Sequence, residues 1–278
     1  MSEPPLEERV RRAVDGDGAA LAELTQALER PVFSLCLRML GDVHDAEDAA
    51  QDVLVKVVTH LSSFEGKSAI TTWVHRIAVL HVLAMKKSRA EERSFDEEGF
   101  AALLDRGLQY AGTQPPPTPE QRTLISEVRL SCTQAMLLTL SREERLSLVL
   151  VDLLGFNSAQ AAEVVETSHD AFRQRLSRAR ARLGGFLEQS CGLASEQAPC
   201  RCERQIPGKI ALGLRRDKQK LSRLSCGDLP TSEQAGTALN ELKNVRRIAS
   251  AFHEGGAFSA PDTLRARMQE LLPTVLER

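Results

Sequence analysis

Arginine side chains crowd one short stretch of this chain, in which residues 157–183 read NSAQAAEVVETSHDAFRQRLSRARARL. No acidic residue lies between Ala171 and Leu183. The basic residues of its second half are Arg173, Arg175, Arg178, Arg180 and Arg182. Guanidinium groups neutralise nucleic-acid phosphates and bind base edges, so this stretch predicts DNA binding rather than bond-making chemistry.

Two short helices that meet at Glu166-Thr167 would position these side chains. The first is expected over about residues 158–165. In the second, one apolar face follows from helical spacing of Phe172, Leu176, Ala179 and Leu183. Ser168 is the expected N-cap, with Asp170 in the first turn. The pattern predicts a helix-turn-helix whose second helix enters a major groove; a solvated basic helix in another bundle is the alternative.

Individual roles on the second helix follow from its expected geometry. Arg173 and Arg178 are expected to contact backbone phosphates, with Arg175 beside them. Residues at the start of the helix are expected to face base edges, and these are Ser168, His169, Asp170 and Gln174.

Cysteine is the second residue type that points to chemistry. Four of the six cysteines come late in the chain, at Cys191, Cys200, Cys202 and Cys226. Four thiolates can hold one zinc ion, a copper(I) ion or an iron–sulfur cluster, although Cys-x-Cys is tighter than the usual zinc-ribbon spacing. Neighbouring arginines would lower the thiol pKa values and suit a redox sensor. Structural thiols without a ligand are the third interpretation.

Acidic and basic residues mark two further helices in the first hundred residues. One helix, expected from Asp45 to Leu61, begins with four carboxylates, Asp45, Glu47, Asp48 and Asp52. They either stabilise the helix dipole or form an acidic surface for a basic partner. The next helix is expected from Ala69 to Arg93. Its residues predicted to face the core are Trp73, Ile77, Leu80 and Ala84. Its basic end, with Lys86 and Lys87, either complements the dipole or binds phosphate near a Trp that can stack on an opened base.

Composition places these patches in an all-α protein. The chain has 278 residues, 42% hydrophobic but only 4% aromatic, and a formal charge of -2. Nucleic-acid binding must therefore come from local patches. No apolar run is long enough to span a membrane, and the start MSEPPLEERVRR is polar, so we expect a cytoplasmic protein without membrane insertion. No nucleophile–base pair or phosphate loop is apparent, so no enzyme activity is expected.

The remaining elements divide the chain into domains. Helical spacing predicts a helix from Ala19 to Leu40, which Pro31 should bend or split. Residues 94–122 lose periodicity and contain QPPPTP, which predicts an extended linker. A helix over residues 120–140 and a capping box at Ser141 lead into the helix-turn-helix. Late helices are expected over residues 231–253 and 263–272, as a docking unit, a regulatory unit or a passive cap on the DNA-reading domain.

The order of these features along the chain resembles the extracytoplasmic-function (ECF) group of bacterial sigma-70 family sigma factors. DAEDAAQDV, residues 45–53, resembles the segment with which the family docks on the clamp helices of RNA polymerase. TTWVHRIA, residues 71–78, matches the TW-x-x-RIA signature of the helix that melts the -10 promoter element. The stretch from residue 157 to 183 is similar to the domain that reads the -35 element. The resemblance covers about Leu21 to Leu187.

This resemblance implies two helical domains, region 2 over residues 1–93 and region 4 over residues 123–190, joined by a flexible linker over 94–122 and followed by a helical extension over 191–278. Polymerase binding is implied for Asp45, Glu47, Asp48, Gln51 and Asp52. Contact with the -10 element is implied for Lys67, Thr71, Thr72, Trp73, Arg76, Lys86 and Lys87. The implied partners are core RNA polymerase, promoter DNA and, as a further candidate, an anti-sigma factor.

The chain also departs from the family pattern. Leu80 and His81 follow the RIA motif where family members commonly have Asn, and Glu166 occupies the turn where they usually have Gly. A left-handed backbone at Glu166 would cost about 1 kcal/mol. The expected function is promoter recognition as a sigma factor with no required cofactor. Regulation through its extension and a metal at the late cysteines are further hypotheses. A stand-alone helix-turn-helix regulator and a thiol-based metal or redox sensor are the alternatives.

Overall fold

A computed structural model describes residues 5–92, 94–110, 119–211 and 260–276. Within these ranges the chain is helical and has no strand; Cys191 and Cys200 form an isolated β-bridge. The expected all-α fold is confirmed. None of the helices described in these ranges is long and apolar enough to cross a membrane.

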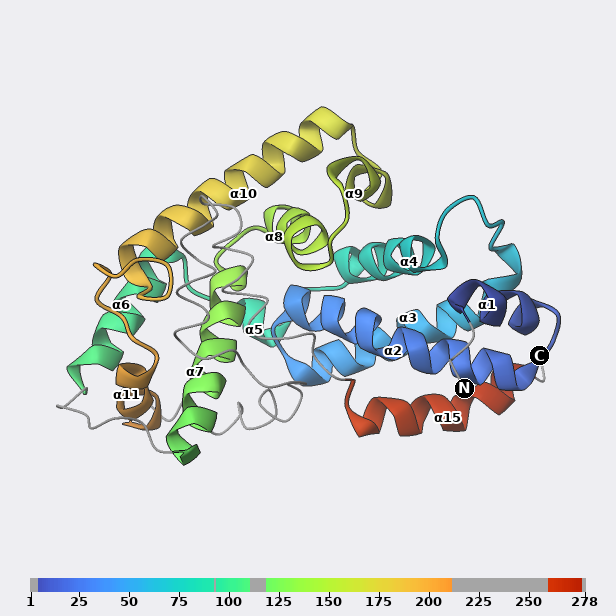
Figure 1. The fold of residues 1–278 in the computed structure, drawn as a ribbon, viewed down its shortest axis with the longest axis horizontal. Coiled ribbons are helices and arrows are strands. Elements are labelled where there is room, and N and C mark those ends of the chain that lie inside the picture. Colours follow the sequence, from blue (N-terminus) through green and yellow to red (C-terminus); the bar gives the residue numbers. More distant parts are fainter. Residues whose placement is uncertain (1–4, 93, 111–118, 212–259, 277–278) are drawn as a thin grey trace.

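The first half of the chain forms a bundle around one long helical pair (Figure 1). Its elements are α1 (Leu6–Val14), α2 (Gly18–Leu40), α3 (Val43–Thr59), a short 3-10 turn η1 (Leu61–Ser63) and α4 (Ile70–Ala84). Gly41 ends α2 with φ 74°, and the Asp42 side chain then accepts hydrogen bonds from the first amides of α3. This glycine and cap turn the chain back sharply, so α2 and α3 pack along their lengths.

Three details of this bundle differ from the sequence-based expectation. Residues 6–14 form a helix where no regular structure was expected, and α2 continues through Pro31, which does not split it. Helix α4 buries Val74, Ala78 and Val82, while Leu80 is 45% exposed, so the predicted inward face was wrong. Contacts with both α2 and α3 select the face that α4 buries.

Helix α4 also ends earlier than expected, at Ala84 rather than Arg93. The chain then turns inward into the short helix α5 (Arg89–Glu92), so that Ser88, just before this helix, and Glu91, within it, become buried. Lys86 and Lys87 therefore lie on an exposed connection beyond the helix rather than on its last turns. Tertiary interactions of the connection outweigh the helical pattern of its sequence.

The segment expected to be a linker contains helix α6 (Glu97–Gln109). Asp96 caps it by accepting a hydrogen bond from the Gly99 amide at 2.8 Å, and Phe100 stacks on Phe186 with ring centroids 5.5 Å apart. Residues 111–118, which hold most of the proline run, lie outside the described ranges. Helix α6 was missed because its short apolar face lies among many charged residues.

The second half continues with helices that confirm most sequence-based expectations. They are α7 (Pro119–Leu138), α8 (Arg142–Leu148), a π-helical turn η2 (Val149–Leu153), α9 (Ser158–Val164) and α10 (His169–Ser190). Both Ser141 and Asn157 form complete capping boxes. A 3-10 turn η3 (Glu203–Gln205), α11 (Ile206–Ala211) and α15 (Asp262–Leu276) complete the described chain. The helix expected over residues 231–253 lies outside the described residues.

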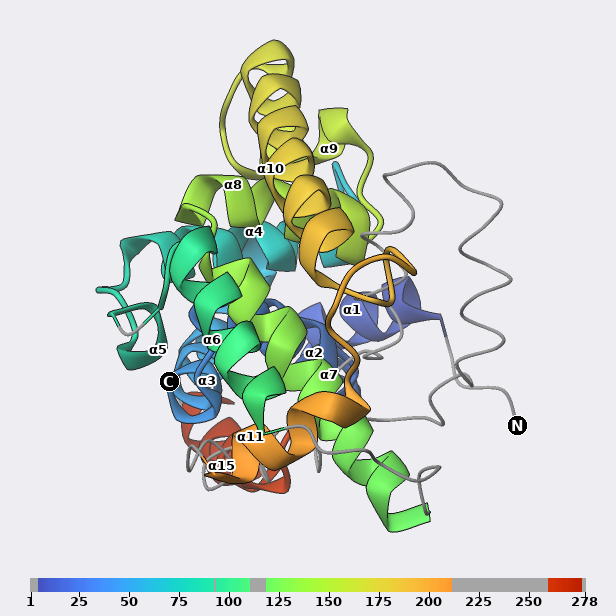
Figure 2. The same cartoon turned by 90° about the vertical axis from the view of Figure 1, so that its left-hand side faces the viewer.

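Figures 1 and 2 show how these helices are arranged in space. Helices α4, α8, α9 and α10 cover one side of the α2–α3 pair, and α15 lies along its opposite side. Helix α15 therefore packs on the first domain and is not a cap on the DNA-reading helices, which was one of the expectations for the tail.

Candidate nucleic-acid interface

Helices α9 and α10 form the predicted helix-turn-helix. Glu166 in the turn adopts φ 54°, so it takes the left-handed conformation that glycine usually provides. Ser168 caps α10 by accepting a hydrogen bond from the Ala171 amide at 3.3 Å. His169 Nε2 lies 2.8 Å from Ser158 Oγ, which joins the starts of the two helices. The N-terminal end of α10 is thereby held by its own cap and by α9.

The two faces of α10 are divided as the spacing predicted. The buried residues include Phe172, Leu176, Ala179 and Leu183, at 0–4% exposure. The exposed residues of the expected DNA-contacting set are Ser168, His169, Asp170, Arg173, Gln174 and Arg178. Arg175 is half-buried. The structure therefore leaves the first half of α10 open, with polar side chains at its start and two exposed arginines beyond them.

The last two arginines of the series form ion pairs with other helices of the protein. Arg180 pairs with Asp152 through contacts of 2.6 and 3.0 Å, both from its guanidinium group. Arg182 bridges Glu97 on α6 and Glu144 on α8 at 2.8 and 2.6 Å. These residues fasten α10 to the rest of the chain and are not available to phosphates in this conformation. The sequence alone did not distinguish them from Arg173 and Arg178.

Helix α4 and the loop before it form the second candidate DNA surface. Trp73 is half-buried and packs at a tilt against Phe64, with ring centroids 5.5 Å apart. Thr71 and Thr72 are half-buried beside it, while Lys67 is exposed and pairs with Glu65. The predicted aromatic and polar residues thus lie together at the start of α4. Lys86 and Lys87 lie beyond its other end.

Arg76 connects the two candidate surfaces. Its guanidinium group forms an ion pair with the carboxylate of Glu166, the residue in the left-handed turn. Nearby, the His75 ring meets Phe156 edge to face at 5.2 Å, and burial lowers the pKa of His75. Helix α4 therefore packs against the helix-turn-helix, and Arg76 is occupied by a protein contact rather than free for DNA.

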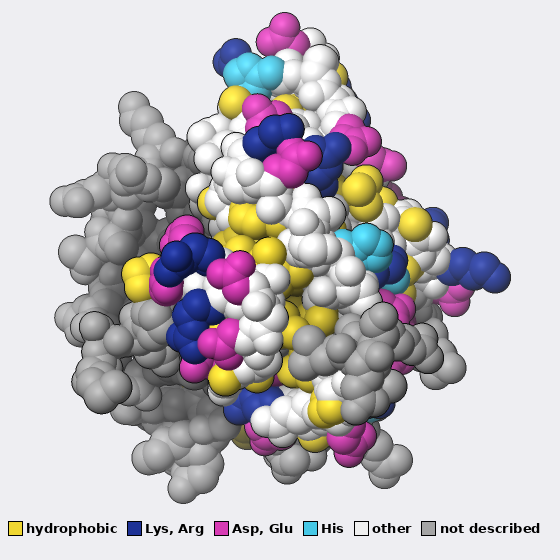
Figure 3. All heavy atoms as spheres, turned by 90° about the vertical axis from the view of Figure 1, so that its right-hand side faces the viewer, with side chains coloured by type: hydrophobic (Ala, Val, Ile, Leu, Met, Phe, Trp, Pro, Cys, Tyr) yellow, Lys and Arg dark blue, Asp and Glu magenta, His cyan; other side chains and the backbone are white. Residues whose placement is uncertain are grey.

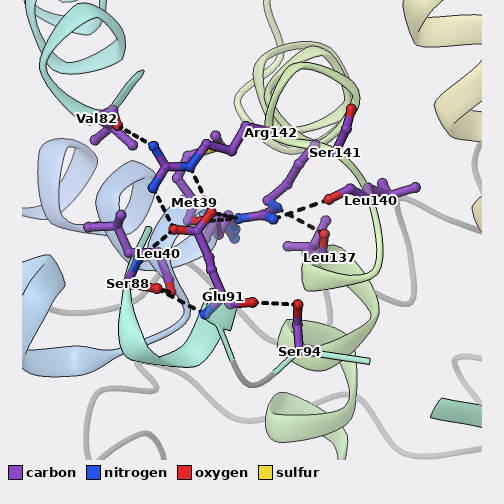
Figure 4. A network of polar contacts seen from close by, with 12 residues as sticks. Met39, Leu40, Val82, Ser88, Glu91, Ser94, Leu137, Leu140, Ser141 and Arg142 are labelled. Carbon is purple, nitrogen blue, oxygen red and sulfur yellow. Dashed lines mark hydrogen bonds and ion pairs between the residues drawn. The ribbon is translucent and has the colours of Figure 1, made fainter. Parts of the chain in front are cut away.

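A buried polar network fixes this packing of the two halves (Figure 4). Glu91, whose side chain is only 4% exposed, accepts hydrogen bonds from Arg142 at 2.6 and 2.8 Å and from Arg145 at 3.0 Å. The Ser88 amide donates to the same carboxylate at 2.9 Å. Burial opposes ionisation of Glu91, but these donors and the charge of Arg145 outweigh it and lower its pKa to about 2.

The two arginines of this network also bind backbone carbonyls of the first half. Arg142 donates to the carbonyl oxygens of Met85 and Lys86 at 2.7 and 2.9 Å, so it caps the end of α4. Arg145 donates to the Met39 carbonyl near the end of α2. Gln134 of α7 adds hydrogen bonds to the Leu37 and Arg38 carbonyls at 2.9 and 3.1 Å. Sequence reasoning missed this interface because its partners lie far apart in the chain.

Helix α15 packs against part of the acidic start of α3. Glu47 is buried and accepts a hydrogen bond from Thr263 Oγ1 at 3.1 Å. Arg267 contacts Asp48 at 2.9 Å and Gln51 at 3.2 Å. Asp45 is half-buried, and exposed Asp52 lies 3.5 Å from His81. The structure thus brings together the residues implied to bind polymerase, and it places the C-terminal helix over three of them.

The cysteines do not behave as an arginine-activated redox site. Cys191 and Cys200 are buried beside each other at their β-bridge. Burial raises the pKa of the Cys191 thiol, and desolvation raises that of Cys202 to about 12, so the expected lowering was wrong. Cys226 lies outside the described residues, and within the described part of the chain no three or more acidic, His or Cys side chains are arranged to hold a metal ion.

Surface charge is mixed on the face shown in Figure 3. Lys and Arg side chains lie next to Asp and Glu side chains, and hydrophobic side chains gather in a band through the middle of the face. No broad basic region appears among the described residues on this face, which agrees with the formal charge of -2. On this face, therefore, any attraction for DNA would have to come from short segments.

Comparison with known proteins identifies both halves. Residues 24–91 match the family model for sigma-70 region 2, and residues 130–183 match that for sigma-70 region 4. The ECF RNA polymerase sigma factor SigG of Mycobacterium tuberculosis is 32% identical over 57% of this chain and 46% of its own length. The chain thus spans about half the length of that relative.

Two shorter relatives match over most of their length. SigW of Bacillus subtilis, another ECF sigma factor, is 23% identical over 63% of this chain and 92% of its own. The RNA polymerase sigma-H factor of Pseudomonas aeruginosa is 28% identical over 66% of this chain and 92% of its own. The sigma factor RpoE, co-crystallised with the anti-sigma factor NepR from Bartonella quintana, is 22% identical with a TM-score of 0.39, over 58% of this chain and 93% of that chain. The chain thus carries matches to sigma-70 regions 2 and 4 in order, and over these regions it is similar to ECF sigma factors.

Proposed function

We propose that this protein binds core RNA polymerase and directs promoter recognition and transcription initiation. The observation that carries the proposal is the pairing of the two sigma-70 regions in one chain, one bearing Trp73 and the other an open helix-turn-helix. The protein itself would act as a DNA-binding regulator, with catalysis supplied by the polymerase. The proposed domains are residues 1–93, 123–190 and 191–278, with 94–122 as the connection.

The first half of α10 is proposed to read the -35 element. Ser168, His169, Asp170 and Gln174 stand at the exposed end of the helix that would enter the major groove. Arg173 and Arg178, and Arg175 with them, would bind phosphates on either side of the groove. The internal ion pairs of Arg180 and Arg182 support this role indirectly, because they brace the helix against the remainder of the domain.

The start of α4 is proposed to open and hold the -10 element. Trp73 is backed by Phe64 and can act as a wedge or a stacking platform for an unpaired base. Thr71 and Thr72 would contact that strand from the same turn, and Lys67, Lys86 and Lys87 would bind its phosphates. Arg76 would join them after it releases Glu166.

Transcription reconstituted from purified components tests the proposal. Transcripts from a responsive promoter should require this chain in addition to core polymerase. The Trp73→Ala variant should bind duplex promoter DNA with polymerase as well as the parent does, but open it less well, because the platform for the unpaired base is missing. Tight promoter binding without polymerase, and no transcripts with it, would instead indicate a stand-alone regulator.

A metal at the late cysteines is a finer part of the proposal. Sigma factors need no cofactor to recognise promoters. The support for a metal is that Cys191, Cys200 and Cys202 fall in one segment and that a backbone bridge joins the first two. Metal analysis of the purified chain beside Cys200→Ser and Cys202→Ser variants tests it, and a metal content that all three share would remove these thiols as ligands.

A further inference from the structure

Helix α15 is held on the first domain by an apolar contact with polar contacts around it. Leu264 and Met268 are 0% and 2% exposed, one helical turn apart on the face that meets α2 and α3. Arg265 Nε lies 3.2 Å from Glu29 Oε2 on α2, a carboxylate whose side chain is only 4% exposed. The remaining faces of α15 carry exposed residues such as Ala266 and Gln269. The helix is thus amphipathic, and its buried side is committed to this contact.

The surface under α15 is the one through which this protein is proposed to bind polymerase. Thr263 donates to Glu47, and Arg267 contacts both Asp48 and Gln51. A helix that docks on the same carboxylates cannot approach while α15 is present, because the two would occupy the same volume and the same hydrogen-bond acceptors.

We propose that α15 is a built-in competitor that holds the protein in a self-inhibited state by covering Glu47, Asp48 and Gln51 of the polymerase-binding residues on α3. This inference rests on the proposed function as a sigma factor. The contacts of α15 also describe the partner that would displace it. This partner would be a helical surface of the polymerase with apolar residues and with cations placed to reach Glu47, Asp48 and Gln51.

The contact is suited to release. The Arg267–Asp48 pair joins side chains that are 47% and 69% exposed, and solvent-exposed pairs of this kind bind weakly. Because α15 belongs to the same chain as its site, its effective concentration there is on the order of millimolar, which offsets the weakness of the individual contacts. The contact of α15 with α3 can therefore be weak by itself, be formed in most molecules, and still be displaced by a partner that binds more tightly. If α15 is bound in about nine molecules of ten, the apparent Kd for polymerase rises about tenfold.

The test measures the affinity of purified core polymerase for the full-length chain and two double variants. Leu264→Asp with Met268→Asp places charges on the buried side of α15 and should release it. Ala266→Asp with Gln269→Asp places the same charges on the exposed side of the same helix and serves as the matched control. We expect the first variant to bind polymerase about tenfold more tightly than the parent, and the control to bind like the parent.

Two further measurements secure the interpretation. The variant Arg265→Glu with Arg267→Glu, which repels the surface without altering buried side chains, should also bind more tightly. A synthetic peptide of residues 260–276 added in excess should weaken polymerase binding by the released variant. Equal affinities for the parent and both releasing variants would overturn the self-inhibition and leave the proposed function standing. If no form of the chain binds polymerase, the proposed function itself fails, and the inference fails with it.

Discussion

At the scale of single residues, Glu91 is the side chain on which the packing of the two halves depends. Its carboxylate lies between Arg142 and Arg145, and Arg145 is only 3% exposed in its side chain. Removing the negative charge would leave that guanidinium buried without a counter-charge. Breaking a buried pair from one side costs about 3–5 kcal/mol because the remaining charge is not solvated.

The Glu91→Gln variant should therefore lose about 3–5 kcal/mol of unfolding free energy in urea titrations at neutral pH. The neighbouring Glu92→Gln, at an exposed position of the same short helix, is the matched control and should change little. Similar losses in the two variants would contradict the role assigned to the buried network.

The contribution of the Glu91 carboxylate to the unfolding free energy should depend on pH. The pKa of Glu91 is about 2 in the folded protein and close to 4.3 in an unfolded chain, so its contribution is fully present above about pH 5 and is lost as the pH falls toward 2. The shift corresponds to about 3 kcal/mol. Unfolding free energies measured from pH 6 to pH 2 should decline more steeply for the parent than for Glu91→Gln. Parallel curves would contradict a lowered pKa of Glu91 in the folded protein.

Helix α10 shows, at the scale of one element, how a single arginine series serves two purposes. Arg173 and Arg178 are exposed, whereas Arg182 binds Glu97 and Glu144. Since each phosphate contact releases counterions, replacing Arg173 or Arg178 by Ala should reduce the slope of log K against log salt by about 0.9 for the polymerase complex on promoter DNA.

Arg182→Ala is the control within the same helix. It should leave the salt slope unchanged and lower the unfolding free energy, because it removes the ion pairs with Glu97 on α6 and Glu144 on α8. Fluorescence anisotropy of labelled promoter DNA over a range of salt concentrations provides the slopes. A slope change for Arg182→Ala equal to that for Arg173→Ala would show that the two groups of arginines are not separated as the structure indicates.

Over the whole molecule, the closed packing of α4 against α9 places both candidate DNA surfaces side by side. If the proposed reading of two separate promoter elements requires the halves to move apart, the Arg76–Glu166 pair and the contact between His75 and Phe156 must be released. Helix α15 lies on the opposite side of the α2–α3 pair, so this opening and the release of α15 concern different surfaces (Figure 2).

Cross-linking would test whether the halves must separate. In a variant with Arg76→Cys and Glu166→Cys, a short bis-maleimide should join the two positions and reduce transcription strongly relative to the same variant without the reagent. The same treatment should not change the activity of either single-cysteine variant relative to its own untreated form. The raised pKa values of Cys36, Cys191 and Cys202 should keep these thiols slow to react at neutral pH. Full activity of the cross-linked protein would show that the closed arrangement is itself competent.

Local sequence determined much of this protein. Caps at Asp42, Ser141 and Ser168 act on amides two or three residues away, and the buried face of α10 follows from helical spacing alone. The positions of the two sigma-70 regions could be read for the same reason, since their motifs lie within short segments. Residues 168–178 could thus be expected at the DNA surface before any contact between distant elements was known.

Tertiary structure alone decided which of these segments pair with one another through their charged side chains. Glu91 meets Arg142, Arg76 meets Glu166, and Arg267 meets Asp48, yet none of these pairs is close in sequence. An exposed arginine and one held in an ion pair look alike in a sequence, because helical periodicity shows which face turns inward but not which distant carboxylate faces it. For the same reason the acidic start of α3 could be predicted as a candidate binding surface, whereas its contact with α15 could be seen only in three dimensions.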